Sequence, residues 1–377
     1  MLIDPRITKL ADTLVNYSCA VRAGEKLLIE AVDVPDAFTT ECIRVAHQAG
    51  AVPLVKLESG LVNRALMMHG SQHGWQLVAD AERFLMDRVN CYIGARGSRN
   101  ISELSDVPPG LHRHYESTVW KQVHLQSRCT RTRWVVLRWP SPAMAQAAAM
   151  STEGLEDFFF KVCTANYAKM AVAMKPLVER LTRAEEIRVV GPGATDLSFS
   201  VAGMGALADD GKHNIPGGEV CTAPVRDSAN GVIHYNTPSE CRGMFFYDVR
   251  LTLKDGKIVD ASASDSRRLN DILDADPGAR YIGEFAFGLN PYCTRAIRDG
   301  LFDEKIAGSI HLALGDAVVY DGAVDNGNRS DIHWDLVLQQ TPDAGGGAIY
   351  LDDELIREDG LFAADDLEPL NPENLRW

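Results

Sequence analysis

The hydrophobic pattern of this 377-residue chain changes its period near residue 187, and this change restricts the possible folds more than any other feature. Before that point, short apolar runs alternate with stripes of helical spacing, as in chains that build a sheet covered by helices. After it, apolar and polar residues alternate as they do in half-buried strands. We therefore predict an α/β domain with a mainly parallel sheet over 1–187 and a β-rich α+β domain over 188–377.

The first sixty residues contain a strand–helix–strand unit. Residues 26–30 form a short apolar run, Asp36 opens a helix with one apolar stripe that stops at Gly50, and 51–57 is the next strand. Units of this kind pair their strands in parallel. Because Pro53 has no N–H to donate, it should lie near the start of its strand or on an edge strand.

The same sequence patterns predict further strands and helices along the chain. Strands are expected at 89–93 and 134–137, and Ser151 should cap a helix. Another apolar stripe over 167–181 predicts a helix with Pro176 inside it. In the second half, 245–254 alternates and turns at Asp255-Gly256, and a second hairpin is expected between 345–350 and 355–356.

Charge and cysteine usage narrow the class of protein. The net charge of −14 argues against nucleic acid or an anionic membrane as a partner. No apolar run reaches the ~18 residues of a membrane span, and the N-terminus lacks the basic-then-apolar pattern of a signal peptide. The eight cysteines form no Cys-x-x-Cys pair. In a chain this long they are most simply buried thiols, so we expect a cytoplasmic protein.

One short segment carries two metal-ligand side chains. Ile332, Trp334, Leu336 and Val337 indicate a strand around His333 and Asp335. Residues two apart on a strand point to the same face, so His333 and Asp335 can bind one ion while Trp334 packs on the other side. Imidazole with carboxylate suits zinc, cobalt, manganese or iron.

Three other residues of the second half have the same ligand chemistry. Glu219 follows two glycines in a loop, Glu284 interrupts an apolar run, and His311 lies in another apolar run. Each has a simpler explanation: a solvated turn for Glu219, an ion pair with an arginine such as Arg295 for Glu284, and a hydrogen-bonded core histidine for His311. Taken together with His333 and Asp335, they supply enough ligands for one or two divalent ions.

The segments around these candidate ligands resemble those of a known family. The block 214–228 (Asn-Ile-Pro-Gly-Gly-Glu-Val-Cys-Thr-Ala-Pro-Val-Arg-Asp-Ser), Gly-Glu at 283, Ile-His-Leu-Ala-Leu-Gly at 310 and Ile-His-Trp-Asp at 332 are similar to metallo-aminopeptidases of the thermophilic aminopeptidase T type. Segments 102–107 and 138–144 also look like parts of this family, so the resemblance spans most of the chain.

The resemblance implies a homodimer in which a two-metal site removes N-terminal amino acids from peptides. The family's metal ligands would fall on Glu219, Glu284, His311, His333 and Asp335. Its sixth site residue, a tyrosine, corresponds to Val318 here, with Tyr320 two residues further on. Without that tyrosine, the second metal of the family's site would lack one of its usual neighbours.

Two alternatives stay open. The 2,5-dihydroxypyridine dioxygenases look like descendants of the same fold and use one iron held by two histidines and an aspartate. They have histidine where this chain has Glu284 and lack a counterpart of Glu219, but His311, His333 and Asp335 could still form such a triad. The other alternative is a metal-binding scaffold without turnover.

We favour a metal-dependent aminopeptidase acting on small peptides or related amides. The ion would be zinc, cobalt or manganese, with iron in the dioxygenase alternative. It would polarise the scissile carbonyl and lower the pKa of a water toward ~7. Glu219 or Glu284 would take the proton, and Arg226 would orient the substrate or stabilise an oxyanion. The acidic site would also attract a substrate ammonium group.

Overall fold

The chain folds into two compact units in a computed structural model that describes residues 4–317 and 324–376. One unit comprises Met1–Thr164 with Gly211–Ile215, and the other Ala165–Asp210 with Pro216–Trp377. The helix α9 (Tyr167–Arg183) belongs to the second unit, although it precedes residue 187. The domain boundary at 187 stays a prediction.

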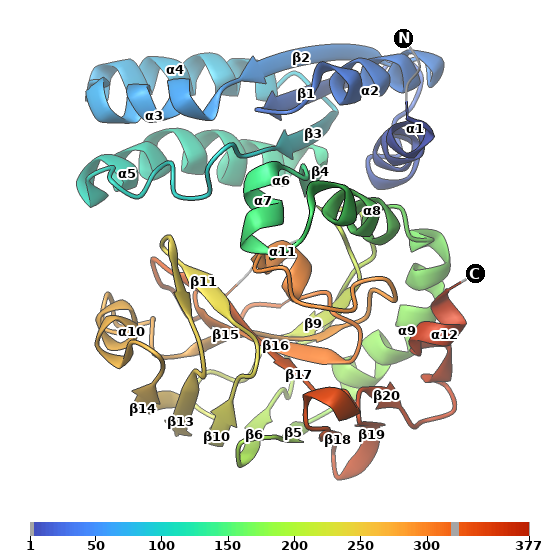
Figure 1. The fold of residues 1–377 in the computed structure, drawn as a ribbon, viewed down its shortest axis with the longest axis vertical. Coiled ribbons are helices and arrows are strands. Elements are labelled where there is room, and N and C mark those ends of the chain that lie inside the picture. The colour runs from blue at the N-terminus through green and yellow to red at the C-terminus, as the bar shows by residue number, and fades with distance from the viewer. Residues whose placement is uncertain (1–3, 318–323, 377) are drawn as a thin grey trace. The chain divides into compact units, whose positions relative to one another are not determined.

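The first unit is built on a parallel five-stranded sheet, as the strand–helix–strand pattern predicted (Figure 1). Its strand order is β2 (Val52–Glu58), β1 (Lys26–Val32), β3 (Cys91–Arg96), β4 (Arg133–Arg138) and β8 (Asn214–Ile215). Pro53 is the second residue of the edge strand β2, where a missing N–H leaves no central ladder incomplete.

Helices precede, connect and follow these strands. They are α1 (Pro5–Asp12), α2 (Asp36–Gln48), α3 (Gly60–His69), α4 (Gln72–Met86), α5 (Pro109–Tyr115), α6 (Cys129–Arg131), α7 (Pro142–Ala147) and α8 (Thr152–Cys163), with π-helical segments η1 (Thr13–Ser18) and η2 (Glu116–Arg128). Ser151 caps α8 as expected, because its side chain accepts a hydrogen bond from Gly154 N at 3.0 Å.

The second unit contains an antiparallel eight-stranded sheet. Its order is β14 (Lys257–Ser262), β13 (Arg250–Lys254), β10 (Asn230–His234), β6 (Thr195–Ser200), β5 (Glu186–Gly191), β18 (Ala348–Leu351), β19 (Glu354–Glu358) and β20 (Leu361–Phe362). The β13–β14 hairpin turns at Asp255-Gly256, where φ is 49° and 77°, the conformation that favours glycine at a tight turn. The predicted second hairpin is β18–β19.

A five-stranded antiparallel sheet in the same unit contains the five predicted metal ligands. Its order is β17 (His333–Gln339), β16 (Ser309–Gly315), β15 (Ile282–Gly288), β9 (Glu219–Thr222) and β7 (Leu207–Asp209). Phe285 of β15 stacks on Phe199 of β6, with ring centroids 5.3 Å apart, so one face of this sheet packs on the eight-stranded sheet. Trp334 lies on that apolar face, as predicted, and its ring is 5.2 Å from Phe246.

The remaining elements of the second unit are short. They are α10 (Ser266–Leu273), α11 (Gly300–Asp303), α12 (Pro372–Leu375), β11 (Ser239–Cys241), β12 (Met244–Phe246) and the 3₁₀ turns η3 (Pro342–Ala344) and η4 (Glu368–Leu370). Within residues 4–317 and 324–376, every helix is too short or too polar to cross a membrane.

Candidate metal centre

The strand registers place all five predicted ligands on one face of the five-stranded sheet. Ala313 of β16 stands opposite Glu284 on one side and Asp335 on the other. His311 is two residues from Ala313, His333 is two from Asp335, and Glu219 stands opposite Gly288 of β15. Because the side-chain period of a strand is two, these residues point away from the phenylalanines of the apolar face.

Small residues form the floor between the ligands. Ala286 is paired with His311, Ala313 lies between the two acids, and Gly288 is paired with Glu219. A larger side chain at any of these positions would occupy the space above the strands. The sheet therefore surrounds a floor of small residues with carboxylates and imidazoles.

His311 is the centre of the cluster. Its Nε2 lies 3.7 Å from Glu219 Oε2, 3.9 Å from Glu284 Oε1 and 3.9 Å from Asp335 Oδ1. His311 is 1 % exposed and Glu219 and Glu284 are also buried, whereas Asp335 is half-buried. Glu284 has these histidine contacts in place of the arginine partner considered for it.

His333 approaches the same acids from the next strand. Its Nε2 lies 3.5 Å from Asp335 Oδ1 and 3.6 Å from Glu284 Oε2. Its Nδ1 lies 2.9 Å from the carbonyl oxygen of Asp316. Because a carbonyl only accepts, Nδ1 donates, and this contact orients Nε2 toward the acids as is usual for ligand histidines.

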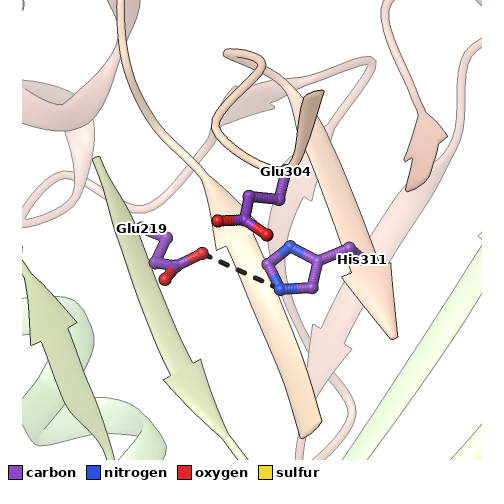
Figure 2. Close-up of side chains that lie close together, drawn as sticks. All are labelled: Glu219, Glu304 and His311. Atoms are coloured by element: carbon purple, nitrogen blue, oxygen red, sulfur yellow. Dashed lines mark ion pairs between the residues drawn. The ribbon is translucent and has the colours of Figure 1, made fainter. Parts of the chain in front are cut away.

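The structure adds a residue that sequence reasoning missed. Figure 2 shows Glu304, just beyond α11, with its carboxylate turned toward Glu219 and His311. A ligand-type atom from each of these three side chains lies within 4.8 Å of the others, and Glu284, His311 and Asp335 form a second such group. His311 belongs to both groups, so the two groups adjoin each other at this residue.

Lys305, also missed, lies directly beside Glu304. Its side chain is fully buried, and its Nζ lies 2.6 Å from Glu219 Oε1, 2.7 Å from Glu304 Oε1 and 3.4 Å from Asp209 Oδ2. In the sequence, Asp303-Glu304-Lys305 reads as a charged surface turn, since three consecutive charges are rarely buried. No periodicity signal distinguishes it from one.

The acids and imidazoles shift each other's pKa. Burial and the neighbouring Glu219 raise the pKa of Glu284. Desolvation by the surrounding groups would lower the pKa of His333, whose outer side remains exposed, but Asp335 and Glu284 raise it to about 10. Burial also opposes ionisation of Asp335, yet the two histidines hold the pKa of that carboxyl below its usual range. The neighbouring carboxylates thus create a negative potential at the centre, which a bound cation would also balance.

Among the five predicted ligands, three buried atoms lack a hydrogen-bond partner among the described residues: Glu219 Oε2, Asp335 Oδ1 and His311 Nδ1. A buried polar atom left unpaired is costly, and each of the two carboxylate oxygens can donate an electron pair to a metal. A neutral imidazole has one nitrogen lone pair, so His311 would bind an ion through Nε2 or Nδ1 and not through both. Carboxylate and imidazole donors around a small-residue floor fit a divalent ion.

The structure does not place the remaining predicted site residues among the metal ligands. Arg226 Nε donates to Asn328 Oδ1 at 3.0 Å, and its guanidinium lies 3.6 Å from the centre of the Tyr281 ring. These contacts give Arg226 a place in loop packing, and its catalytic role stays a prediction. Val318 and Tyr320, where the family tyrosine was considered, lie outside the described residues.

Comparison with known proteins agrees with this chemistry. Residues 3–361 match the family described as "Thermophilic metalloprotease (M29)". The chain is 24% identical to aminopeptidase PepS of Streptococcus thermophilus, over 88% of this chain and 91% of that protein.

Two solved structures share the fold. Wild-type AmpT from Thermus thermophilus has a TM-score of 0.80 at 20% identity, covering 96% of this chain and all of that one. The 2,5-dihydroxypyridine dioxygenase of Pseudomonas putida KT2440 has a TM-score of 0.61 at 13% identity, covering 96% of this chain and 98% of that one.

Proposed function

The chain belongs to the thermophilic metalloprotease family M29 and is a metal-dependent aminopeptidase, and from this premise we propose that its site is the cluster around His311. The single observation that carries this proposal is the convergence of Glu219, Glu284, His311, His333 and Asp335 on one sheet face, with His311 Nε2 within 3.9 Å of three carboxylates. In our proposal these five residues bind one or two ions of Zn²⁺, Co²⁺ or Mn²⁺.

The roles follow from the contacts. A bound divalent ion supplies Lewis-acid activation of the scissile carbonyl and a water of lowered pKa. Glu219 and Glu284 are our candidates for the general base: one Glu219 oxygen is held by Lys305, while the other, Oε2, has no hydrogen-bond partner among described residues. The excess of carboxylates attracts the substrate's terminal ammonium, which suits an enzyme acting at amino termini. We propose small peptides or related amides as substrates.

The dioxygenase alternative is less well supported. An iron site of that kind needs two histidines and one carboxylate, and His311, His333 and Asp335 could form it. Here Glu219 and Glu284 also lie within 3.9 Å of the histidine nitrogens, so the centre holds more carboxylates than a facial triad uses.

Metal exchange under controlled oxygen tests the reaction class. We expect the chelated protein to regain cleavage of dipeptides and amino-acyl p-nitroanilides when Zn²⁺, Co²⁺ or Mn²⁺ is added, with equal rates in air and without oxygen. The same preparations loaded with Fe²⁺ should leave a dihydroxypyridine intact. Oxygen-dependent ring opening with iron alone, and no amide cleavage, would reverse the assignment.

We also propose that the protein is a cytoplasmic homodimer. The apolar, alanine-rich stretch 139–150 could in principle pack in a dimer interface. It gives the dimer no support, because Trp139 and Met144 are buried and the Trp139 ring lies 4.8 Å from Phe38 of the same unit. Better support comes from Leu57, Leu61 and Val62, which are 65%, 50% and 57% exposed within a few residues of one another. Exposed apolar groups of this kind often mark interfaces.

Light scattering during size-exclusion chromatography should give about twice the 41.3 kDa chain mass. Leu57→Glu with Val62→Glu places charges on the exposed apolar surface, so this double variant should shift the protein toward monomer without unfolding it. Its control is the same pair of charges at the exposed Val172 and Val259. A wild-type monomer at micromolar concentration would refute the dimer.

A further inference from the structure

Lys305 is a buried cation that the proposed mechanism does not use. Its side chain has no exposed surface, and three carboxylates from β7, β9 and the end of α11 surround it. Asp209 and Glu219 are directly opposite each other in the β7–β9 ladder. Like charges in that position repel each other, so the ammonium group of Lys305 between them stabilises this register.

The backbone holds Lys305 rigidly against the Glu219 loop. The carbonyl oxygen of Lys305 accepts a hydrogen bond from Asn290 N at 3.0 Å, and Asn290 Nδ2 donates to Gly217 O at 2.9 Å. Gly218 has φ +120°, and a Cβ there would lie 2.9 Å from Asn290 Cβ. The segments that carry Lys305 and Glu219 are therefore fixed to each other through Asn290.

We propose that Lys305 is a positioning residue for the metal centre: it fixes one oxygen each of Glu219 and Glu304 and thereby sets both carboxylates as ligands beside His311. The inference rests on the proposed function and extends it to Glu304, which becomes a ligand on the Glu219 side. Glu219 Oε2, left without a hydrogen-bond partner among described residues, lies 3.7 Å from His311 Nε2. Outer groups that orient ligands in this way commonly tune metal affinity 10–100-fold.

Titration of the metal-free protein with Co²⁺ tests the proposal, because the visible absorption of cobalt reports its ligand geometry. Lys305→Met removes the charge and keeps most of the volume. We expect its cobalt affinity to fall roughly 10–100-fold and its absorption bands to shift. The matched control is Arg357→Met, which removes another buried cation of the same unit, 1 % exposed and bonded to Ser309 O and Gln340 Oε1. Arg357→Met should lower the thermal midpoint but leave the cobalt spectrum unchanged.

Two further variants keep the test decisive. If Lys305→Met does not fold, Lys305→Gln takes its place, because the amide keeps a hydrogen-bond donor in the buried position. The amide is shorter than lysine and has no charge, so its cobalt bands should shift in the same way. Glu304→Gln should weaken cobalt binding while Glu219 keeps its lysine. Wild-type affinity and spectrum in folded Lys305→Gln and Glu304→Gln would overturn the inference. A wild-type protein that binds no cobalt would instead overturn the proposed function, so the two failures are distinguishable.

Discussion

His311→Ala is expected to remove the bound metal and abolish peptide cleavage. His311 is the one residue common to both possible metal groups, and its Nε2 lies within 3.9 Å of Glu219, Glu284 and Asp335. Loss of this ligand should cost more than loss of an outer orienting group, so turnover should fall at least about 100-fold. Elemental analysis of the purified variant and rates on a dipeptide measure the two effects.

His124→Ala is the matched control for that variant. His124 belongs to the first unit and is 3 % exposed, close to the 1 % of His311, so both changes delete a buried imidazole. The control should lose thermal stability and retain metal content and turnover per folded molecule. If His311→Ala also retained full metal and full rate, His311 would be an ordinary core histidine and the site would lie elsewhere.

Glu219→Gln is expected to reduce kcat by roughly 10²–10⁴-fold, the usual contribution of a positioned proton acceptor. Glutamine has the same shape and can still accept the hydrogen bond of Lys305 through its amide oxygen, so the fold should survive. The neutral amide binds a cation less well and cannot take a proton. Steady-state kinetics at saturating Zn²⁺ separates a loss of kcat from a loss of metal, and circular dichroism checks folding.

Glu41→Gln supplies the comparison. Glu41 is 1 % exposed and paired with Arg44 at 2.6 Å, so it is another buried, ion-paired glutamate, but it lies in the first unit. Its replacement should affect stability and leave kcat unchanged. Equal kcat values for Glu219→Gln and the wild type would assign Glu219 a structural role only.

The small residues beneath the ligands explain why this sheet can hold a site at all. A strand that is buried on both faces normally carries large apolar side chains along its whole length. Here Phe285 and Phe287 fill one face of β15, while Ala286 leaves room beside His311 on the other. One run of seven buried residues thus serves both the core and the candidate centre.

The amino-acid sequence by itself determined the local features of this protein, namely the type of each element and the direction of its side chains. Period-two alternation put His333 and Asp335 on one strand face, and the strand–helix–strand pattern at the start predicted a parallel sheet. These inferences hold because side-chain direction in a strand depends only on neighbours within a few residues.

Only the tertiary structure decided which distant groups share a site. The register of β15, β16 and β17 sets Glu284 and Asp335 on either side of Ala313, and register depends on packing of the whole sheet. Asp303-Glu304-Lys305 reads as a solvated turn until the fold surrounds it. The charged Lys305 can be buried because carboxylates from three separate elements contact its ammonium group. These carboxylates are far apart in the sequence, so no short segment of it predicts their meeting.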